Sequence, residues 1–322
     1  MPSDVTIVIP NWNGAGRLTR AIQSAQSQTI EPKEILVVDN GSTDDSYQEA
    51  CDAGALVLRF EKNTGFSRAV NAGVGECSTH WVAIVNNDVV LEPTWLENLL
   101  AGCGPDTAYA SGKILNAKDH SVIDGTYDLL SWSGCAWRAG HGAPAARFHQ
   151  AREVHFVPLT AALVQRDIFL RMGGLDVRFE SYLEDIDFCL TCAAAGLQGR
   201  YIPEAIAYHE GSATLGAWSP RMVELLARNQ IYLISKHFPG RLTRPVLAGQ
   251  LLWGLLALKR GAGVAWLKGK WKGLTSLRGI RPSQFDAARL TAILQDSEDE
   301  IRKLQADQGD TFWEQYFRWR GR

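Results

Sequence analysis

The chain has 322 residues, of which 46% are hydrophobic and 21% are charged, and its formal net charge is −2. This balance is typical of a folded globular protein, argues against disorder, and gives no electrostatic reason to expect nucleic acid as a partner. The six cysteines are scattered and hold one close pair, Cys189 and Cys192, so we expect reduced thiols, no four-ligand zinc site and a cytoplasmic location. We expect no signal peptide, and no apolar stretch reaches the ~20 residues of a membrane-spanning helix.

The first hundred residues alternate between short apolar runs and helical patterns. Strands are predicted at residues 5–9, 34–39, 56–60 and 81–85, and helices at 15–28, after the turn 40–44 with Ser42 or Thr43 as cap, and at 67–75. Strands this apolar are buried on both faces, so the alternation predicts an α/β fold with a mostly parallel sheet flanked by helices. Ligands of such sheets bind beyond the carboxyl ends of the strands.

The middle of the chain has weaker periodicity. Residues 105–153 contain glycines, Trp132 and Trp137, and are predicted to be irregular with room for one hairpin. A strand at 154–157, helices near 166–172 and over 183–195, and a short strand at 200–202 are predicted next. From residue 219 the chain reads as helical, which divides it into a domain over 1–218 and a helical extension over 219–322.

Polar clusters follow the four predicted strands of the first hundred residues. They are Pro10-Asn11-Trp12-Asn13-Gly14, Asp39-Asn40-Gly41-Ser42, Asn63-Thr64-Gly65-Phe66 and Asn86-Asn87-Asp88. Each cluster alone is explained by turn chemistry, because Asn, Asp and Gly favour turns. Four clusters on one edge of a sheet favour a binding site over four coincidences.

Asp88 is the sharpest of these residues, because a buried strand delivers its carboxylate to the edge of the sheet. Hard cations such as Mg²⁺ and Mn²⁺ prefer oxygen ligands and often bind one or two carboxylates together with substrate phosphates. The alternative is that Asp88 caps a helix that starts at 91–93. His209 follows a predicted strand and is a second candidate ligand, although a lone histidine is more often structural.

Three carboxylates lie within four residues in the segment Glu184-Asp185-Ile186-Asp187. Acidic side chains at a helix start are stabilised by the helix dipole, by about 0.3–1 kcal/mol each, which is the structural explanation. It does not account for so tight a cluster, because the charges repel each other. Paired carboxylates are suited to a general base whose pKa is set by its neighbour and by burial.

Together these residues resemble family 2 glycosyltransferases of the GT-A fold, especially the bacterial rhamnosyltransferase-like branch. The similar segments occur in order over residues 4–215, and they are 5–13, 37–44, 63–71, 86–88, 173–176, 184–187 and His209. Three positions depart from the family pattern. Asn86 replaces the first acid of the metal motif, Thr191 stands where the family commonly has Arg, and Leu159-Thr160-Ala161 replaces a turn of small residues.

The resemblance implies roles for particular residues. The nucleotide-binding set would be Pro10, Asn11, Trp12, Asn13, Asp39, Asn40, Ser42, Asn63, Gly65, Arg68, Asn71, Asn86 and Asn87. Asp88 and His209 would hold Mg²⁺ or Mn²⁺, and Asp185, with Glu184 beside it, would be the catalytic base. The implied reaction is inverting transfer of a sugar from a UDP- or dTDP-sugar to a glycan acceptor, free or lipid-linked, in polysaccharide or cell-wall synthesis.

The segment 231–281 contains ten Lys or Arg residues, no Asp or Glu, and Trp253, Trp266 and Trp271. A basic, tryptophan-containing helical segment fits peripheral contact with the inner face of a membrane. The alternatives are a solvated appendage or a homodimer contact. Beyond it, 284–308 is predicted to be a charged helix, and the tail 312–322 is aromatic and basic.

Two rival functions stay open at this point. A sugar nucleotidyltransferase would carry a Gly-rich, basic phosphate loop after the first strand, and residues 11–17 are only partly of that kind. A non-catalytic protein that binds nucleotide sugars would not need the Glu184-Asp185 pair.

Overall fold

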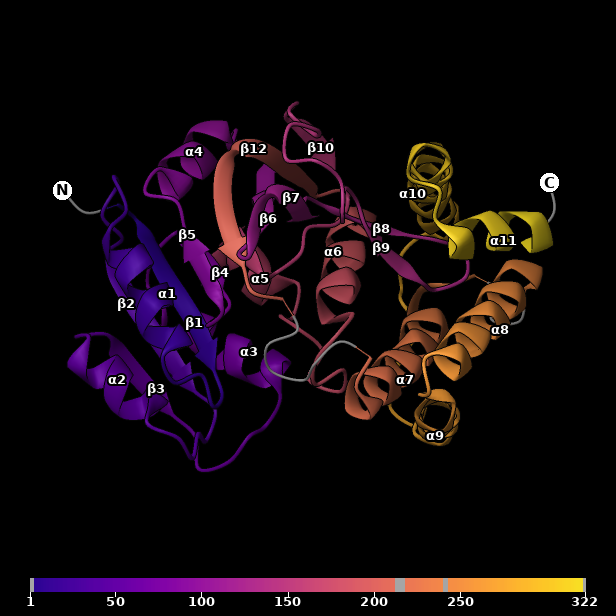
Figure 1. Ribbon diagram of the computed structural model, residues 1–322, viewed down its shortest axis with the longest axis horizontal. Coiled ribbons are helices and arrows are strands. Elements are labelled where there is room, and N and C mark those ends of the chain that lie inside the picture. Colours follow the sequence, from indigo (N-terminus) through magenta and orange to yellow (C-terminus); the bar gives the residue numbers. More distant parts are fainter. Residues whose placement is uncertain (1–2, 212–217, 240–242, 321–322) are drawn as a thin grey trace.

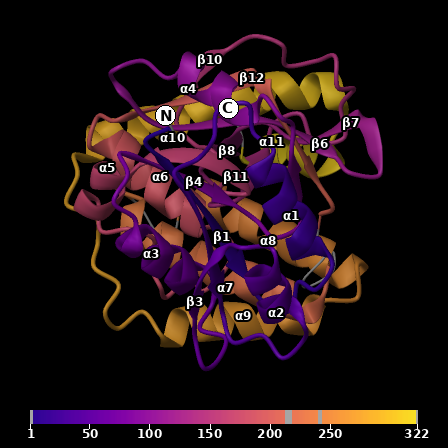
Figure 2. The same ribbon diagram turned by 90° about the vertical axis from the view of Figure 1, so that its left-hand side faces the viewer.

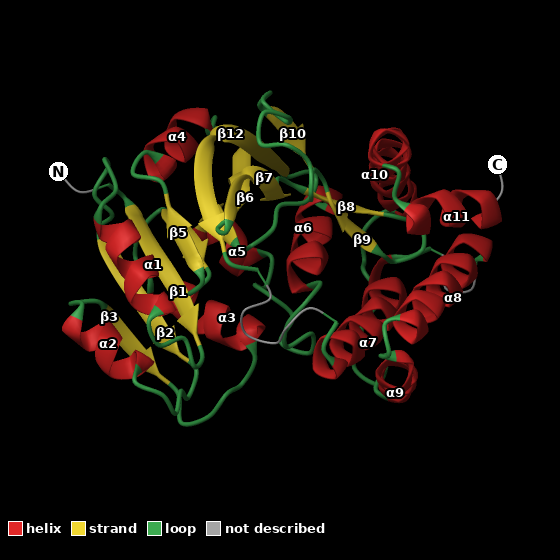
Figure 3. Cartoon of the chain, in the orientation of Figure 1, coloured by secondary structure: helices red, strands yellow, loops and turns green. Residues whose placement is uncertain are grey.

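The computed structural model of the chain describes residues 3–211, 218–239 and 243–320, and it has one large sheet at its centre with helices on both faces (Figure 1, Figure 3). The first hundred residues form the parallel part of this sheet. Its strands are β1 (Val5–Asn11), β2 (Glu34–Asp39), β3 (Leu56–Arg59) and β4 (Trp81–Val85), and its helices are α1 (Arg17–Gln26), α2 (Ser46–Asp52) and α3 (Phe66–Glu76). β1 lies between β2 and β4 and is parallel to both.

The rest of the sheet is mixed. The strands β6 (Thr107–Asn116), β10 (Arg152–Val154), β11 (Ala161–Gln165) and β12 (Gln198–His209) extend it in the order β10-β12-β6-β11-β4-β1-β2-β3. Two short strands join this part, β5 (Val89–Leu91) beside β12 and β7 (Asp119–Gly125) beside β6, and β8 (Asp128–Leu130) pairs with β9 (Ala136–Arg138) in a separate hairpin. The helices here are α4 (Trp95–Gly102), α5 (Arg166–Arg171) and α6 (Glu184–Ala194). The predicted α/β class with helices flanking a sheet is confirmed, although β11 is antiparallel to both of its neighbours.

Alternating side chains of β1 explain why helices cover both faces. All seven residues of β1 are buried, as expected for a strand in the middle of a covered sheet. Ile7 and Ile9 belong to the hydrophobic cluster that includes Leu18 and Ile22 of α1. Val8, which points to the other face, belongs to the cluster that includes α3 and α6.

The prediction for residues 105–153 is only partly right, because the segment contains antiparallel hairpins, as allowed for, but also a long regular strand that was not expected. β6 is a ten-residue strand in the middle of the sheet, and β7 returns beside it. Gly112 weakened the pattern, yet the packing requires it, because a Cβ there would lie 1.8 Å from the backbone oxygen of Ala205. Ser111 and Lys113 are also buried, so the strand lacks the apolar character that burial on both faces normally imposes.

Other boundaries also differ from prediction. The strand expected at 154–157 lies at Arg152–Val154, β11 was not foreseen, and the short strand at 200–202 extends over twelve residues as β12. The helix after the 40–44 turn begins at Ser46 with Asp45 as its N-cap, so neither Ser42 nor Thr43 caps it. Asp88 is not a helix cap, because β5 follows it and Thr94 is the N-cap of α4.

The C-terminal segment is helical, as predicted. It forms α7 (Pro220–His237), α8 (Arg244–Lys259), α9 (Gly263–Thr275), α10 (Ala287–Gln308) and α11 (Thr311–Arg320), which stand behind the sheet when the molecule is seen from the N-terminal side (Figure 2). The division at 218/219 stays a prediction, and a single hydrophobic cluster contains both Val8 of β1 and Leu233 of α7. Within the described part of the chain, no helix combines the length and hydrophobicity that membrane crossing requires.

Candidate active site

A cavity of about 880 Å³ opens beyond the carboxyl ends of β1 and β4, between the sheet and the start of α6 and α7. Most of the predicted site residues line it, although they come from segments far apart in the chain. They are Pro10, Asn11, Trp12, Asn40, Asn63, Gly65, Asn86, Asn87, Asp88, Glu184, Asp185 and His209. The sequence-based expectation that the acids at 88 and 185 and the imidazole at 209 share one cleft therefore agrees with the structure.

Three further predicted site residues lie behind the cavity wall, namely Asn13, Asp39 and Ser42. The Nδ2 atom of Asn11 is 3.3 Å from Asp39 Oδ1 and 3.2 Å from Ser42 Oγ, and the backbone N–H of Asn13 donates to Ser42 Oγ at 3.0 Å. Asp39 is completely buried, and its Oδ2 lies 3.3 Å from Arg59 Nε. These bonds hold the two loops after β1 and β2 together, and nucleotide contacts by these three residues stay a prediction.

Arg68 and Asn71 do not line the cavity. Arg68 is exposed on α3. Asn71 binds the backbone of Leu175 in both directions, donating to its oxygen at 2.7 Å and accepting from its N–H at 2.8 Å. Asn71 thus ties α3 to the turn after α5, and nucleotide binding by either residue has no support from its position.

Asp88 and His209 meet at one end of the cavity. Antiparallel pairing of β12 with β5 places His209 opposite Val89, so its Nε2 comes within 3.4 Å of Asp88 Oδ1. The other ring nitrogen, Nδ1, lies 2.9 Å from Oδ2 of Asp124, which belongs to β7. A carboxylate behind a histidine in this way orients the ring for a cation on its far side. Asp124 was missed by the sequence analysis, because β7 was not predicted.

The same contacts set the protonation of this end of the cavity. Burial disfavours a charged imidazole, but hydrogen bonds to Asp124 and Asp88 outweigh it and raise the pKa of His209 to about 9. Burial likewise works against ionisation of Asp124, yet the His209 hydrogen bond and the Arg138 charge lower the pKa of this carboxyl. A protonated His209 therefore lies between the carboxylates of Asp88 and Asp124. A divalent cation bound to Asp88 and His209 would displace a proton from the imidazole and supply the positive charge in its place.

The donor atoms at this end fit a hard divalent cation whose coordination is completed by its ligand. Asp88 supplies a carboxylate, His209 an imidazole, and the Oδ1 atom of Asn86 is buried without a hydrogen-bond partner. Among the described residues, no group of three or more His, Cys, Asp or Glu side chains is arranged to hold a metal ion. Mg²⁺ and Mn²⁺ often bind this way, with few protein ligands plus phosphate oxygens and water.

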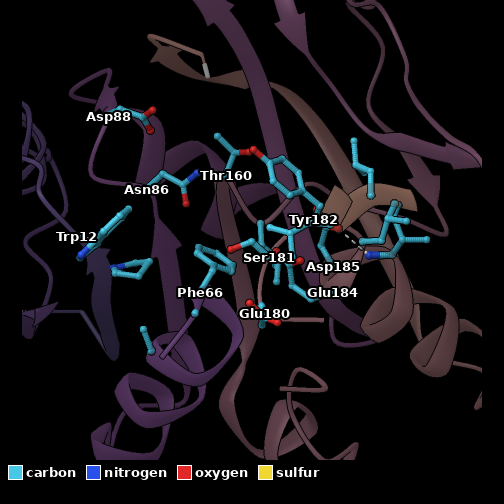
Figure 4. A pocket seen from close by; sticks show the side chains of 18 of the residues that line it. Trp12, Phe66, Asn86, Asp88, Thr160, Glu180, Ser181, Tyr182, Glu184 and Asp185 are labelled. Atoms are coloured by element: carbon cyan, nitrogen blue, oxygen red, sulfur yellow. Dashed lines mark hydrogen bonds between the residues drawn. The ribbon is translucent and has the colours of Figure 1, made fainter. Parts of the chain in front are cut away.

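Glu184 and Asp185 lie at the other end of the cavity, in the first turn of α6 (Figure 4). Glu184 is buried and its Oε2 has no hydrogen-bond partner, and burial together with the charge of Asp185 raises the pKa of Glu184 well above its ordinary value. Asp185 is half-buried, and its Oδ1 accepts the N–H of Ile186 at 2.8 Å. Burial also raises the pKa of Asp185, against the opposing effect of that bond and of Arg138. Asp185 is thus the better placed of the two to take a proton from a ligand.

The third acid of this cluster has a structural function. Asp187 is buried, and its carboxylate lies 2.6 Å from Lys236 Nζ and 2.7 Å from His237 Nε2, both on α7. It does not line the cavity. The three acids are close in the sequence, but Glu184 and Asp185 face the cavity, whereas Asp187 pairs with α7.

Arg138 connects the two ends of the cavity. Its guanidinium lies 3.3 Å from Asp124 and 3.5 Å from Asp128, and both Arg138 and Asp128 line the cavity wall. Burial raises the pKa of Asp128 to about 7, although the charge of Arg138 opposes this rise. Neither residue was singled out in the sequence, because both belong to the hairpin β8–β9 within the segment predicted to be irregular.

The loop before α6 has an unusual backbone. Glu180, Tyr182 and Leu183 have positive φ angles of 62°, 70° and 67°, and all three line the cavity. Residues other than glycine rarely adopt this conformation, and where they do the surrounding structure must hold it in place. Such strain at a cavity wall is typical of a functional site.

An α/β sheet with a polar cavity at its carboxyl edge defines a class of nucleotide-binding enzyme folds. A family model described as "Glycosyl transferase family 2" matches residues 6–173, and the chain belongs to this family. The "Pre-mycofactocin glycosyltransferase" of Mycobacterium tuberculosis (strain ATCC 25618 / H37Rv) is 30% identical over 275 residues. The match covers 81% of this chain and 54% of the relative, so this chain spans about half of that protein's length.

A second relative in the same organism is the "N-acetylglucosaminyl-diphospho-decaprenol L-rhamnosyltransferase", 26% identical over 67% of this chain and 79% of that protein. The resemblance drawn from the sequence motifs is confirmed by these matches.

Solved structures support the fold. GalNAc-T7, solved with UDP, GalNAc and Mn²⁺, superposes with a TM-score of 0.62 and 15% identity over 77% of this chain and 50% of that one. The mannosyltransferase PcManGT of Pyrobaculum calidifontis, solved with GDP-Man and Mn²⁺, has a TM-score of 0.56 and 14% identity over 98% of this chain and 85% of that one. At such low identity these structures establish the GT-A-like fold alone.

The buried, unpartnered Glu184 predicts a pH-dependent cost of folding. Its raised pKa means that the folded chain holds this proton more tightly than the unfolded chain, so stability falls as pH rises above 4.5. Glu184→Gln cannot ionise, and we expect it to be more stable than the wild type at pH 8, with the gain vanishing near pH 5. Denaturant unfolding across this pH range measures the difference. Glu31→Gln, at an exposed position, is the control, and an equal gain in both variants would contradict the interpretation.

Proposed function

We propose that this protein transfers a sugar from a UDP- or dTDP-sugar to a hydroxyl of a glycan acceptor, with inversion at the anomeric carbon and with Mg²⁺ or Mn²⁺. The proposal rests on the different side chains at the two ends of the cavity. Asp88 and His209 stand at the end where a diphosphate and cation fit, and Asp185 stands at the end where an acceptor hydroxyl would lose its proton. Family membership supports the same reaction.

The donor would bind across the edge formed by β1 and β4. Trp12 and Phe66 offer aromatic faces in the cavity wall (Figure 4). Asn63 adds an exposed amide group beside them, whereas the amides of Asn11 and Asn40 bind neighbouring loop residues. Aromatic faces and amides of this kind suit a nucleobase and a ribose. The UDP in the GalNAc-T7 structure supports a nucleoside diphosphate as the donor's leaving group.

The chemistry follows from the placement of Asp185. Its raised pKa makes it a stronger base than an ordinary aspartate, so it can accept the proton of an acceptor hydroxyl as that oxygen attacks the anomeric carbon. Attack from the side opposite the diphosphate inverts the configuration in one displacement, and a second nucleophilic carboxylate is not needed. A divalent cation held by Asp88 and His209 would offset negative charge on the departing diphosphate.

The acceptor is proposed to be lipid-linked. The name of the rhamnosyltransferase relative gives a diphospho-decaprenol-linked sugar, which supports this class of acceptor. Location on the inner face of the cell membrane and a role in polysaccharide or cell-wall synthesis belong to the same proposal. A homodimer remains the alternative use of the C-terminal helices.

Asp185→Asn tests the assigned base. Loss of a positioned general base typically lowers turnover by about 10²–10⁴-fold, and we expect a loss in this range. The affinity for UDP should change by less than about threefold, because the proposed nucleotide end of the cavity is untouched. A panel of UDP- and dTDP-sugars with Mn²⁺, scored for nucleoside diphosphate release, gives turnover, and calorimetry gives the affinity. Full turnover in the variant would remove Asp185 from the mechanism, and pyrophosphate release from a sugar 1-phosphate and a nucleoside triphosphate would favour a nucleotidyltransferase.

Asp124→Asn tests the cation end. An amide in place of this carboxylate weakens the hydrogen bond that orients His209, and changes behind a ligand typically lower metal affinity about 10–100-fold. The midpoint of Mn²⁺-dependent thermal stabilisation of the UDP-bound protein measures this. Asp119→Asn, on an exposed part of β7, is the matched control. Equal Mn²⁺ midpoints for both variants would argue against His209 as a ligand.

The outer faces of α8 and α9 support the proposed membrane contact. They expose eight large apolar side chains, here called the apolar face, which are Leu247, Leu251, Leu255, Leu258, Val264, Leu267, Trp271 and Leu274. Most are half exposed or more, and Val264 is 82% exposed. Within each helix the four residues recur every three or four positions, so they lie along one face, and exposed apolar faces of this kind mark interaction surfaces.

The basic residues contribute less to this surface than their number suggests. Lys268 and Lys272 pair with Glu224, and Lys236 pairs with Asp187, while residues 240–242 lie outside the described part of the chain. Lys259, Arg260, Arg278 and Arg281 are exposed, and each of the four ends α8 or follows α8 or α9 closely in the chain. The proposed occupant is therefore a bilayer with anionic headgroups, bound mainly by apolar burial.

The double variant Leu267→Gln, Trp271→Gln tests this surface. We expect its binding to vesicles of phosphatidylglycerol and phosphatidylethanolamine to fall at least about tenfold, since two large side chains no longer favour the acyl region. Co-sedimentation with vesicles measures binding. Leu56→Gln, Leu170→Gln, at exposed apolar positions elsewhere, should bind as the wild type does. Unchanged vesicle binding with a shift in oligomeric state would instead assign the face to a second copy of the chain.

A further inference from the structure

One buried amide on α7 holds the loop that leads into α6. Asn229 is completely buried, and its Nδ2 lies 2.9 Å from the backbone oxygen of Phe179, 2.8 Å from that of Ser181 and 2.7 Å from that of Tyr182. The two hydrogens of this amide are shared among three carbonyl groups. A side chain that binds three carbonyls of one loop fixes the path of that loop more tightly than a single bond does.

Arg228 orients this amide and completes the set. Its Nε donates to Asn229 Oδ1 at 2.9 Å, which directs the NH₂ group of Asn229 toward the loop. Its Nη2 donates to the oxygens of Phe179 and Arg178 at 2.8 and 3.1 Å. The remaining carbonyl, that of Glu180, accepts the N–H of Ser67 on α3 at 3.0 Å. Five consecutive carbonyls, 178 to 182, are therefore bound from outside the loop.

The bonds coincide with the strained part of the backbone. Glu180, Tyr182 and Leu183 are the residues with positive φ, and Leu183 is the N-cap of α6. Such a conformation persists only where surrounding contacts enforce it. Asp185 lies two residues beyond this cap, so the position of its carboxylate depends on the path of the loop.

α7 itself is held firmly enough to serve as a brace. The ion pairs of Asp187 with Lys236 and His237 connect it to α6, in addition to the bonds from Asn229 and Arg228 to the preceding loop. On its other side α9 packs closely through glycines, since a Cβ at Gly269 would lie 2.3 Å from the oxygen of Glu224, and one at Gly273 would lie 2.9 Å from Ile231 Cβ. Movement of α7 away from the loop is thereby opposed on both sides.

We propose that Asn229, oriented by Arg228, is a positioning residue for sugar transfer, which holds the strained 179–183 loop so that Asp185 faces the acceptor. The inference rests on the proposed role of Asp185 as base. It gives the C-terminal helices a part in the reaction that does not depend on membrane contact. It also predicts that the effect of Asn229 is felt mainly in turnover, because the loop carbonyl that meets the proposed nucleotide side, that of Glu180, is held by Ser67 and not by Asn229.

Three variants of α7 test the proposal. Asn229→Ala removes all three bonds, Asn229→Asp keeps the shape but turns acceptor oxygens toward three carbonyls, and Gln230→Ala is the matched control. Gln230 is equally buried on the same helix, but its side chain bonds Lys270 and Cys135 and not the loop. Each variant is measured for melting temperature, for affinity toward UDP with Mn²⁺, and for kcat of UDP or dTDP release from the best nucleotide sugar.

We expect both Asn229 variants to lose kcat by about 100-fold, the loss typical of a catalytic group displaced by about 1 Å, while UDP affinity stays within about threefold. Gln230→Ala should keep kcat even where its melting temperature falls as far. Loss of kcat in Gln230→Ala equal to that in the Asn229 variants, or wild-type kcat in Asn229→Ala, would overturn the proposal.

Two further variants keep the result decisive. If the Asn229 variants do not fold, Arg228→Lys, which retains the charge but lacks the Nε that orients Asn229, takes their place, and wild-type kcat in it counts against the proposal. Asp185→Asn, measured alongside, separates the two hypotheses. Full activity in Asp185→Asn would reject the proposed base, whereas loss there with wild-type kcat in Asn229→Ala would reject only the positioning function.

Discussion

Burial of acidic side chains around one cavity is the constraint on which the rest of this structure depends. Asp88, Asp124, Asp128, Glu184 and Asp185 lie in or beside its wall, and charges removed from water need compensation. The chain supplies it unevenly, because the acids near β7 and β8 have Arg138 and His209, whereas Glu184 keeps an oxygen without a partner. The least compensated carboxylates face the space in which a ligand would lie. This distribution separates the proposed reactive end of the cavity, at Glu184 and Asp185, from the end at which His209 and Arg138 compensate the acids.

The two parts of the sheet contribute differently to this arrangement. The parallel strands β1 to β4 end in loops that bind each other through Asn11 and Asn40, and so form a rigid edge. The mixed part brings in groups from much later in the chain, since β12 carries His209 to β5 and β7 carries Asp124 to the same place. The strained loop before α6 then closes the cavity from the side of α7. Each of these parts of the cavity is therefore held by contacts between residues that are far apart in the sequence.

The sequence predicted the residues whose positions follow from local rules. Asp88 follows an apolar strand, and the Glu184-Asp185 pair opens a helix, so both could be placed at a ligand-binding edge before the structure was known. Asp124 and Arg138 could not, because their segment has no regular period and their function comes from pairing with distant strands. Gly112 illustrates the reason, since the residue that breaks the strand pattern is the one that lets β12 approach. Similarly, nothing local separates Asp187, which binds α7, from its two neighbours.

The braced loop has a consequence for how the chain is divided. A fragment that ended at residue 218 would retain every predicted site residue, yet it would leave the carbonyl groups of Arg178, Phe179, Ser181 and Tyr182 without the donors they have in the intact chain. The positive φ angles of Glu180, Tyr182 and Leu183 would then lack the contacts that enforce them. On the proposed function of Asn229, a catalytic unit would have to extend through α7, beyond the boundary at 218/219 that the sequence predicts.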